Sequence, residues 1–194
     1  MPNTLKVYTR TGDEGTACLY TGQRRDKDDL VFEALGDADE LNSAIGVASQ
    51  YCSSAGNGIS EQLGEIQSRI LDVGSAIATP LGEASLFKAK RATFDAEAVA
   101  KLEAWIDEMD DKLDPLTSFI LPSGGLASAN LHVARTVCRR VERRAVALAR
   151  DGKLEDSVRV YLNRLSDYLF TAARFAAKFE GQEEVTYKKA QTDP

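Results

Sequence analysis

The sequence is poor in the residues that bind transition metals or form disulfides, since it has one histidine and three cysteines. Cys18, Cys52 and Cys138 are far apart, and none belongs to a Cys-x-x-Cys pair. Zinc sites and disulfide frameworks are built from closely spaced clusters of these residues. We therefore expect free thiols in a reducing compartment and no metal site made of side chains.

Familiar catalytic arrangements are also missing. The sequence has no pattern typical of a Ser–His–Asp or Cys–His site, and its acids do not form the Glu-x-x-His pairs of di-iron bundles. The single histidine, His132, stands between Leu131 and Val133, where a packed or surface position is more common than a catalytic one. A function that depends on other residue types is therefore favoured.

Long apolar runs are absent. No run approaches the ~20 residues that cross a bilayer, and the start of the chain does not resemble a signal peptide. The net charge of −6 disfavours nucleic acid and anionic membranes as partners, so an anion site must be a local concentration of positive charge. We expect a soluble protein in the cytoplasm, or in the mitochondrial matrix if the source is eukaryotic.

Helical periodicity is the main pattern that the sequence does contain. Apolar residues recur three or four positions apart, as in Val31, Leu35 and Ala38. The pattern predicts five helices, at about 28–52, 60–78 and 95–113, from after Gly125 to about 150, and at about 155–180. Short connections, including an expected loop at 83–94, imply an all-α, antiparallel five-helix bundle.

The whole chain, residues 1–194, is expected to form one domain. An irregular lead-in (1–27) precedes the bundle (28–180), and a loose, polar tail (181–194) follows it. The lead-in contains the run Thr9–Thr16, in which glycine, threonine and charged residues alternate. Such a loop can cradle phosphates with its backbone N–H groups, although it is not a Walker motif and a plain loop remains an alternative.

Arginines are concentrated in the fourth predicted helix. Arg135, Arg139 and Arg143 are spaced four residues apart and form one stripe, while Arg140 and Arg144 form a second row beside it. Like charges this close repel one another unless anions compensate them, and arginine suits bidentate capture of phosphate. The segment therefore indicates a polyphosphate site. The alternative is a solvated face whose arginines pair with acids of neighbouring helices.

Polar residues on other helices offer partners for these arginines. The segment 36–42 contains Asp37, Asp39 and Glu40, which could answer arginines of another helix or of another subunit. Asn163 and Asp167 share a face of the last helix, and we expect both to hydrogen-bond the arginines of the fourth helix. In the lead-in, Lys27 and the pair at 24–25 could add positive charge.

Five segments together resemble one protein family. They are Tyr8–Asp13, Gly36–Asn42, Phe119–Gly125, Arg139–Arg144 and Asn163–Phe170. In this order and spacing they resemble the PduO-type ATP:corrinoid adenosyltransferases over nearly the whole chain. The resemblance implies a homotrimer with active sites between subunits. It implies transfer of the 5′-deoxyadenosyl group of ATP, accompanied by Mg²⁺, to the cobalt of reduced cobalamin, giving adenosylcobalamin and triphosphate.

The resemblance also implies roles for individual residues. ATP would contact Thr9, Arg10, Thr11, Gly12, Ala17, Cys18, Lys27, Arg139, Arg140, Glu142, Arg143 and Asn163. Cobalamin would contact Phe119, Phe170, Asp167 and His132. The catalytic set would be Arg139, Arg143, Asp39 and Phe119. Asp39 resembles an acid that pairs with Arg139 across the subunit interface, and Phe119 resembles the aromatic residue that keeps the lower cobalt ligand away.

Two alternatives belong to other classes of protein. Glu14 stands where many family members have lysine, and the tail lacks a phenylalanine that some members place over the corrin. These departures fit a non-catalytic protein that binds ATP or adenosylcobalamin and delivers it to a cobalamin-dependent mutase. A helical interaction module, whose arginines only pair with acids, is the third possibility. For the enzyme, a cobalt reductase and such a mutase would be partners.

Overall fold

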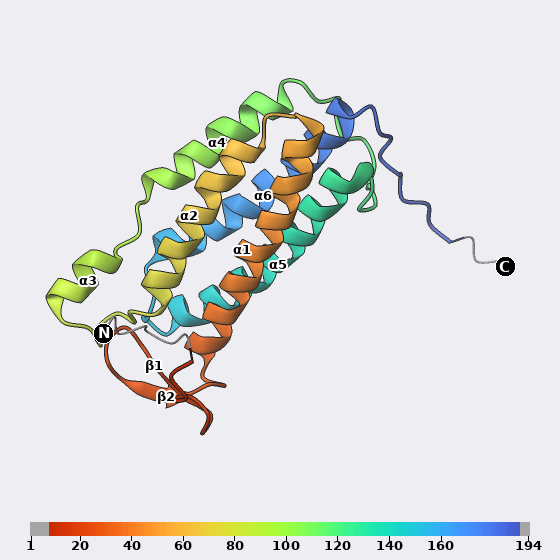
Figure 1. The fold of residues 1–194 in the computed structure, drawn as a ribbon. Coiled ribbons are helices and arrows are strands. Elements are labelled where there is room, and N and C mark those ends of the chain that lie inside the picture. Colours follow the sequence, from red (N-terminus) through yellow and green to blue (C-terminus); the bar gives the residue numbers. More distant parts are fainter. Residues whose placement is uncertain (1–7, 191–194) are drawn as a thin grey trace, which may run out of the picture.

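The computed structural model describes residues 8–190 and consists mainly of long helices packed side by side (Figure 1). The elements in chain order are β1 (Thr16–Cys18), β2 (Arg24–Asp26), α1 (Leu30–Ala55), α2 (Ser60–Ile77), α3 (Leu86–Ala92), α4 (Glu97–Asp110), α5 (Gly125–Arg150) and α6 (Asp156–Phe179). Residues 1–7 of the lead-in and 191–194 of the tail lie outside the described part. Among the helices of residues 8–190, none has the length and hydropathy needed to cross a membrane.

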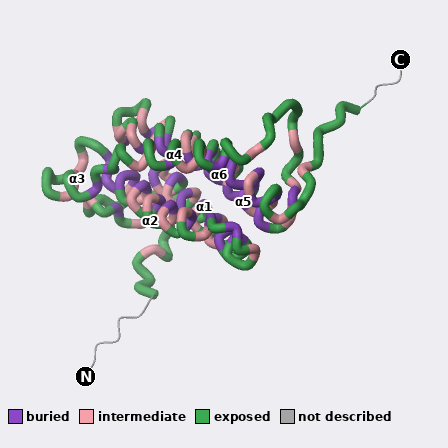
Figure 2. The backbone as a smooth tube through the Cα atoms, turned by 90° about the horizontal axis from the view of Figure 1, so that it is seen from above, coloured by how far each residue is buried: buried purple, intermediate pink, exposed green. Residues whose placement is uncertain are grey.

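The five long helices, α1, α2, α4, α5 and α6, confirm the all-α bundle predicted from the sequence. Helix α1 packs against α2 and α5, α5 packs against α6, and α6 packs against α4. Their inward faces form one core, which Figure 2 shows as the purple stretches of each helix. Leu41, Ile45, Leu131, Leu162 and Leu165 are completely buried there. Burial of such side chains stabilises the fold by about 1.5–3 kcal/mol each.

Local signals fix where α1 begins and ends. The Asp29 side chain accepts a hydrogen bond of 2.8 Å from the backbone N–H of Val31, which satisfies one of the free donors at the helix start. At the other end Gly56 has a φ of 68°, a left-handed conformation that glycine adopts without the steric cost of a Cβ. These two residues therefore set the length of the helix that carries the acids of segment 36–42.

Three elements were not predicted. The loop expected at 83–94 contains α3, whose N-cap is Ser85; its hydroxyl accepts a hydrogen bond from Lys88 N. The lead-in, expected to be irregular, contains the antiparallel pair β1–β2, in which Ala17 lies opposite Arg25. All three elements are too short to give a recognisable period in the sequence, since α3 has seven residues and each strand has three.

The tail also differs from the loose segment that was expected, because part of it pairs with the chain before α5. Tyr187 N donates a hydrogen bond of 2.8 Å to Phe119 O, and Leu121 N donates one of 2.8 Å to Val185 O. These bonds form a short antiparallel ladder beyond the end of the bundle. The composition of the tail is polar, but the bonds that hold it use backbone groups, which composition does not reveal.

Replacing Leu131 with alanine should lower the free energy of unfolding by about 2–5 kcal/mol, because the side chain is completely buried in the core and its loss leaves a cavity. The matched control is Leu86→Ala, since that leucine is 91% exposed and should change the value by less than about 0.5 kcal/mol. Urea denaturation at one fixed protein concentration measures both. Equal effects of the two substitutions would contradict the described core.

Candidate functional site

The arginines of α5 fall into two rows with different surroundings. Arg140 Nε lies 3.0 Å from Asp37 Oδ1, and its Nη2 also bonds Glu40. Arg144 Nη1 lies 3.0 Å from Glu33 Oε2. The hydrogen bond with Glu40 raises the pKa of Arg140. These pairs confirm that acids of segment 36–42 answer arginines of another helix, and they compensate one row of positive charge within the chain.

The other row consists of Arg135, Arg139 and Arg143, and it has no such compensation. Among residues 8–190, no acid forms an ion pair or hydrogen bond with any of the three. Arg139 and Arg143 are exposed, whereas Arg135 is half-buried, with its Nε enclosed and lacking an acceptor. Burial and the charge of Arg139 lower the pKa of Arg135. Uncompensated arginines in such a row have the chemistry that suits an anion.

Among residues 8–190, Asn163 and Asp167 of α6 form no bond with the arginines of this row. Asn163 Nδ2 donates a hydrogen bond of 2.9 Å to Glu142 Oε1, and Asp167 Oδ2 lies 2.7 Å from Arg164 Nη1. Arg164 Nε in turn donates to Glu103 Oε1 on α4. The expectation that Asn163 and Asp167 bond the arginines of α5 is therefore wrong. Asp167 finds a cation one turn away on its own helix, which requires no contact with α5.

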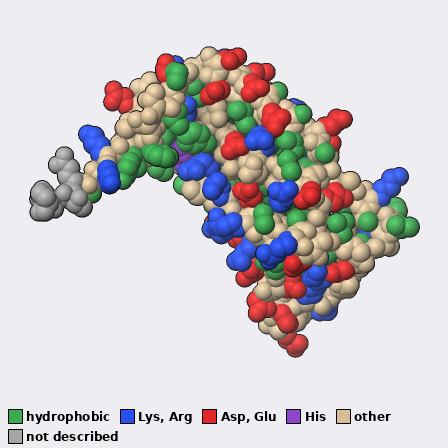
Figure 3. All heavy atoms as spheres, turned by 180° about the vertical axis from the view of Figure 1, so that it is seen from behind, with side chains coloured by type: hydrophobic (Ala, Val, Ile, Leu, Met, Phe, Trp, Pro, Cys, Tyr) green, Lys and Arg blue, Asp and Glu red, His purple; other side chains and the backbone are tan. Residues whose placement is uncertain are grey.

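Figure 3 shows the face on which the Lys and Arg side chains gather in a band, with hydrophobic side chains beside its upper end. Arg135 belongs to the arginine row and also contacts an aromatic side chain, because its guanidinium carbon lies 5.8 Å from the centre of the Phe170 ring. A cation in this position is attracted by the ring quadrupole. The open arginine row therefore runs directly into an aromatic surface.

His132 is packed beneath that surface. It is 3% exposed, and its ring meets the edge of the Phe170 ring at a centroid distance of 5.9 Å. Burial, with a smaller contribution from the charge of Arg135, lowers the pKa of His132 to about 4. The imidazole is therefore neutral at pH 7, and its Nδ1 has no hydrogen-bond partner within residues 8–190.

Phe119 is the most exposed aromatic residue near the start of α5, with 83% of its surface accessible. Its carbonyl oxygen is held by the tail ladder, so the backbone beneath the exposed ring is fixed. Leu121 and Leu126, which follow it in the sequence, are exposed as well. An apolar patch of this kind on a soluble domain usually marks a binding surface.

The lead-in brings together most of its predicted residues. The hydroxyls of Thr9 and Thr11 lie 2.9 Å apart, and Arg10 between them has a φ of 60°, which is uncommon for a residue with a side chain. A Cβ placed on Gly12 would lie 3.1 Å from Lys27 Nζ, so the absence of a side chain lets the ammonium group lie against the loop. Backbone strain and a close cation are typical of a ligand-binding loop.

The other lead-in residues have mainly structural contacts. Ala17 pairs with Arg25 in the hairpin, and Cys18, at the end of β1, is exposed. Arg24 Nη2 donates hydrogen bonds to Thr11 O at 2.7 Å and to Thr16 Oγ1 at 2.6 Å. The guanidinium groups that were expected to add charge for phosphate are therefore engaged with the protein, and Lys27 is the cation that lies against the loop.

Asp39 lies on a different side of α1 from the acids that pair with α5. It lines a groove of about 520 Å³ between α1 and α2, together with apolar residues such as Leu35 and Ile70. In the part of the chain that the structure describes, Asp39 forms no ion pair, and none joins it to Arg139. An exposed acid in a mostly apolar groove is suited to a basic partner from outside the chain.

The predicted residues thus form separate groups within one chain. Across residues 8–190, no hydrogen bond or ion pair links the lead-in to the row of Arg135, Arg139 and Arg143. The same range contains no group of three or more His, Cys, Asp or Glu residues that could hold a metal ion. The four-residue repeat placed Arg135 in the stripe, but the residue roles implied by the family resemblance left it out. The tail ladder was not predicted, because no local signal indicates it.

A helical bundle with an open arginine row beside an aromatic surface defines a class of protein that binds an anionic and a largely apolar ligand together. Residues 7–176 match the family described as cobalamin adenosyltransferase, and the chain belongs to this family. The match covers the lead-in, all of α5 and most of α6. The matched region thus spans every group of residues described above except the tail residues of the ladder.

Relatives with known names agree with this assignment. The chain is 52% identical over 188 residues to the corrinoid adenosyltransferase MMAB of Bos taurus, which covers 97% of this chain and 78% of the relative. It is 39% identical over 188 residues to the corrinoid adenosyltransferase of Bacillus subtilis, covering 96% of this chain and 94% of the relative.

Solved structures show the same fold. A variant PduO-type ATP:corrinoid adenosyltransferase from Lactobacillus reuteri, complexed with cobalamin and ATP, superimposes with a TM-score of 0.87 at 35% identity. The superposition covers 95% of this chain and all of that one. A second variant of the Lactobacillus reuteri enzyme, complexed with ATP, gives a TM-score of 0.85 at 35% identity over 94% of this chain.

The buried His132 should make the protein less stable as the pH falls from about 6.5 to about 4. Its pKa is about 4 in the folded protein and 6.5 as a reference for the unfolded chain, so in this window only the unfolded state takes up the proton. The loss should reach on the order of 3 kcal/mol near pH 4. Denaturation of the wild type and of His132→Asn at several pH values measures it. The substituted protein should lack this part of the pH dependence, and parallel curves would contradict the assignment.

Proposed function

We propose that the protein transfers the 5′-deoxyadenosyl group of ATP to the cobalt of reduced cobalamin, releasing triphosphate. The observation that carries this proposal is the row of Arg135, Arg139 and Arg143, which lacks acid partners among residues 8–190 and leads into the aromatic surface around Phe170. A triphosphate and a corrin ring are the two ligand chemistries that such a junction fits. Membership of the cobalamin adenosyltransferase family supports the same reaction.

ATP binding is assigned to two groups of residues. The lead-in contributes Thr9, Arg10, Thr11, Gly12, Ala17, Cys18 and Lys27, and the bundle contributes Arg139, Arg140, Glu142, Arg143 and Asn163. Backbone N–H groups and Lys27 in the lead-in suit phosphate oxygens. Glu142 and Asn163 are already joined by a hydrogen bond, so they offer the ribose or the base a fixed pair of polar groups. Arg140 acts mainly through its position, since α1 acids already neutralise it.

The reaction requires little acid–base catalysis from the protein. Cobalt(I) of the corrinoid substrate is the nucleophile, the new bond joins cobalt to C5′ of ATP, and the bond from C5′ to O5′ breaks. Negative charge then develops on the departing triphosphate. Arg139 and Arg143 are exposed on one stripe and stabilise that charge without reorganising, which is where preformed cations lower a barrier most.

The corrin is assigned to the surface formed by Phe119, Phe170, Asp167 and His132. The ladder with the tail fixes the backbone of Phe119, and so fixes the position from which its exposed ring projects. We infer that this ring lies beneath the corrin and excludes the lower cobalt ligand, which makes cobalt(II) easier to reduce. His132 is neutral at pH 7, so it adds no charge to the floor of an apolar pocket.

A homotrimer would complete this site. The lead-in and the arginine row share no polar contact within the described chain, so we propose that they meet across a subunit interface. Asp39 in its groove would then pair with an arginine of the neighbouring subunit. The family resemblance assigns Arg139 as that arginine, whereas the enclosed Nε of Arg135, which lacks an acceptor, makes Arg135 the stronger candidate on physical grounds.

Other partners follow from the reaction. Mg²⁺ would arrive on the phosphates of ATP. A reductase must supply the cobalt(I) state, and an adenosylcobalamin-dependent mutase would receive the product. The buried free thiols Cys52 and Cys138 suit a reducing compartment, either a bacterial cytoplasm or a mitochondrial matrix.

The direct test is formation of adenosylcobalamin from ATP and chemically reduced cobalamin, followed by its absorbance, with triphosphate measured in parallel. Stoichiometric formation of both products supports the proposal. Tight binding of cobalamin without turnover would instead identify a delivery protein, and the absence of any ATP binding by calorimetry would leave only a structural module.

Replacing Arg139 or Arg143 with alanine should raise the activation barrier by on the order of 2–4 kcal/mol, a loss of roughly 30- to 1,000-fold in kcat/KM for ATP. The matched control is Arg150→Ala, since Arg150 is exposed at the end of the same helix and should leave the rate unchanged. Steady-state kinetics with saturating cobalamin measures the effect. If turnover is unchanged in both alanine variants, the open row serves only the fold.

Reversing the charge of Asp39 tests the trimer. Asp39→Arg should reduce assembly, because it would place two cations together at the interface, and adding Arg135→Glu should restore it. Light scattering coupled to size-exclusion chromatography measures the mass of each variant. Restoration by Arg139→Glu instead would assign the pair to Arg139. A fully assembled Asp39→Arg trimer would contradict the proposed contact.

A further inference from the structure

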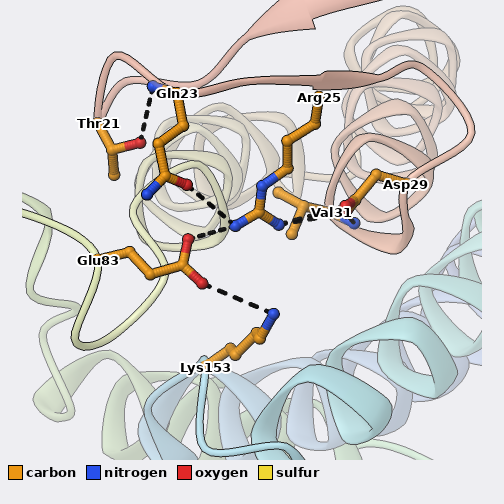
Figure 4. A network of polar contacts seen from close by, with 7 residues as sticks. All are labelled: Thr21, Gln23, Arg25, Asp29, Val31, Glu83 and Lys153. Carbon is orange, nitrogen blue, oxygen red and sulfur yellow. Dashed lines mark hydrogen bonds and ion pairs between the residues drawn. The ribbon is translucent and has the colours of Figure 1, made fainter.

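Arg25 is the centre of a polar cluster that joins the N-terminal hairpin to the bundle (Figure 4). Its Nη1 lies 3.3 Å from Asp29 Oδ2, and its Nη2 bonds Glu83 and, at 3.3 Å, Gln23 Oε1. The Glu83 carboxylate extends the cluster to Lys153, whose Nζ lies 3.6 Å from Oε1. The Arg25 side chain is only 16% exposed, so its bonds are partly shielded from solvent.

The partners of Arg25 come from separate parts of the fold. Asp29 is the N-cap of α1, Glu83 lies in the connection between α2 and α3, and Lys153 lies in the connection between α5 and α6. The last two connections are themselves joined, because Leu81 N donates a hydrogen bond of 2.9 Å to Lys153 O. A single guanidinium group therefore ties β2 directly to two points at one end of the bundle, and through Glu83 to a third.

The neighbouring residue, Arg24, has the complementary task within the hairpin. Successive side chains of a strand point to opposite faces. Arg24 accordingly turns away from the cluster and bonds Thr11 O and Thr16 Oγ1, which shapes the loop before β1. Besides the bonds of Arg25, the hairpin accepts a hydrogen bond of 2.9 Å at Tyr20 O from Lys88 Nζ on α3. The loop that carries the proposed phosphate contacts is therefore shaped by Arg24 and fastened by Arg25.

We propose that Arg25 is a positioning residue for ATP: through Glu83 and Asp29 it holds the hairpin, and with it the loop 9–12 and Lys27, in the orientation that ATP requires. The proposal rests on the function assigned above. Among residues 8–190, the Arg25 guanidinium bonds Asp29, Glu83 and Gln23, and no bond joins it to the loop 9–12. Its effect on ATP is therefore conformational, because a hairpin that is not fastened must be ordered when the nucleotide binds.

Loss of this cluster should weaken the binding of ATP. Without Arg25, the free protein populates hairpin orientations that do not accept ATP, and the apparent affinity decreases by the fraction that remains competent. Arg139 and Arg143 lie on α5 and are untouched, so the chemical step should proceed once ATP is bound. We expect Arg25→Gln to raise KM for ATP about tenfold, with kcat and the KM for cobalamin unchanged.

The experiment compares Arg25→Gln, Glu83→Gln and the double variant. If the two residues act through one contact, the double variant should raise KM for ATP no more than the larger single effect. Arg25→Lys should restore only part of the affinity, since one ammonium group cannot bond Asp29 and Glu83 as a planar fork does. The matched control is Arg159→Gln, which breaks an ion pair of 3.1 Å with Asp156 in the first turn of α6 and should change nothing.

A second measurement does not depend on turnover. Amide hydrogen exchange without ATP should become at least several-fold faster for residues 16–27 in Arg25→Gln, while the amides of α1, α5 and α6 keep their protection. Unchanged exchange in the hairpin would overturn the proposal. So would a variant in which kcat falls and the KM values for ATP and for cobalamin rise to the same extent. Loss of protection throughout the helices would overturn it as well. If the wild type forms no adenosylcobalamin, the proposed function fails, whereas the exchange data and calorimetry with ATP still decide the role of Arg25.

Discussion

The packing of α5 between α1 and α6 is the constraint on which the rest of the site depends. Leu131, Cys138 and Val141 are buried along one side of α5 and fix its rotation about its own axis. Once this rotation is fixed, the two arginine rows must point to different neighbours. Arg140 and Arg144 meet the acids of α1, and the remaining row opens along α6.

The open row has an energetic cost that the core offsets. Three arginines on one stripe repel one another, and Arg135 is partly desolvated as well. No acid among residues 8–190 relieves this repulsion, so the free protein holds cations in an unfavourable arrangement. A bound polyanion would reverse the sign of the interaction. Functional sites commonly keep such strain because the interactions that would remove it would also occupy the site.

Two segments outside the long helices are attached to the bundle by contacts between distant parts of the chain. The tail ladder fixes Phe119 before α5, and the Arg25 cluster fastens the hairpin before α1. Both attachments use residues that are distant in sequence from the groups they hold. The bundle therefore supplies a rigid frame, while short irregular segments carry the groups that would meet the ligands.

The sequence by itself determined the five long helices of this protein and the faces on which their side chains lie. Helical spacing located the five long helices, and the four-residue repeat separated the row of Arg135, Arg139 and Arg143 from the row of Arg140 and Arg144. The motifs of the lead-in and of α5 and α6 were sufficient to indicate the family. These features depend on residues within one or two helical turns, so a linear reading can reach them.

Only the tertiary structure decided which charges meet. It paired Asn163 with Glu142 and Asp167 with Arg164, where the sequence suggested the arginines of α5. It also turned Arg25 toward Glu83, 58 residues away, instead of toward a phosphate. A charged side chain chooses among several partners of similar chemistry, and packing far along the chain determines which of them comes within reach. Periodicity fixes the face on which a residue lies, but it cannot fix what stands opposite that face.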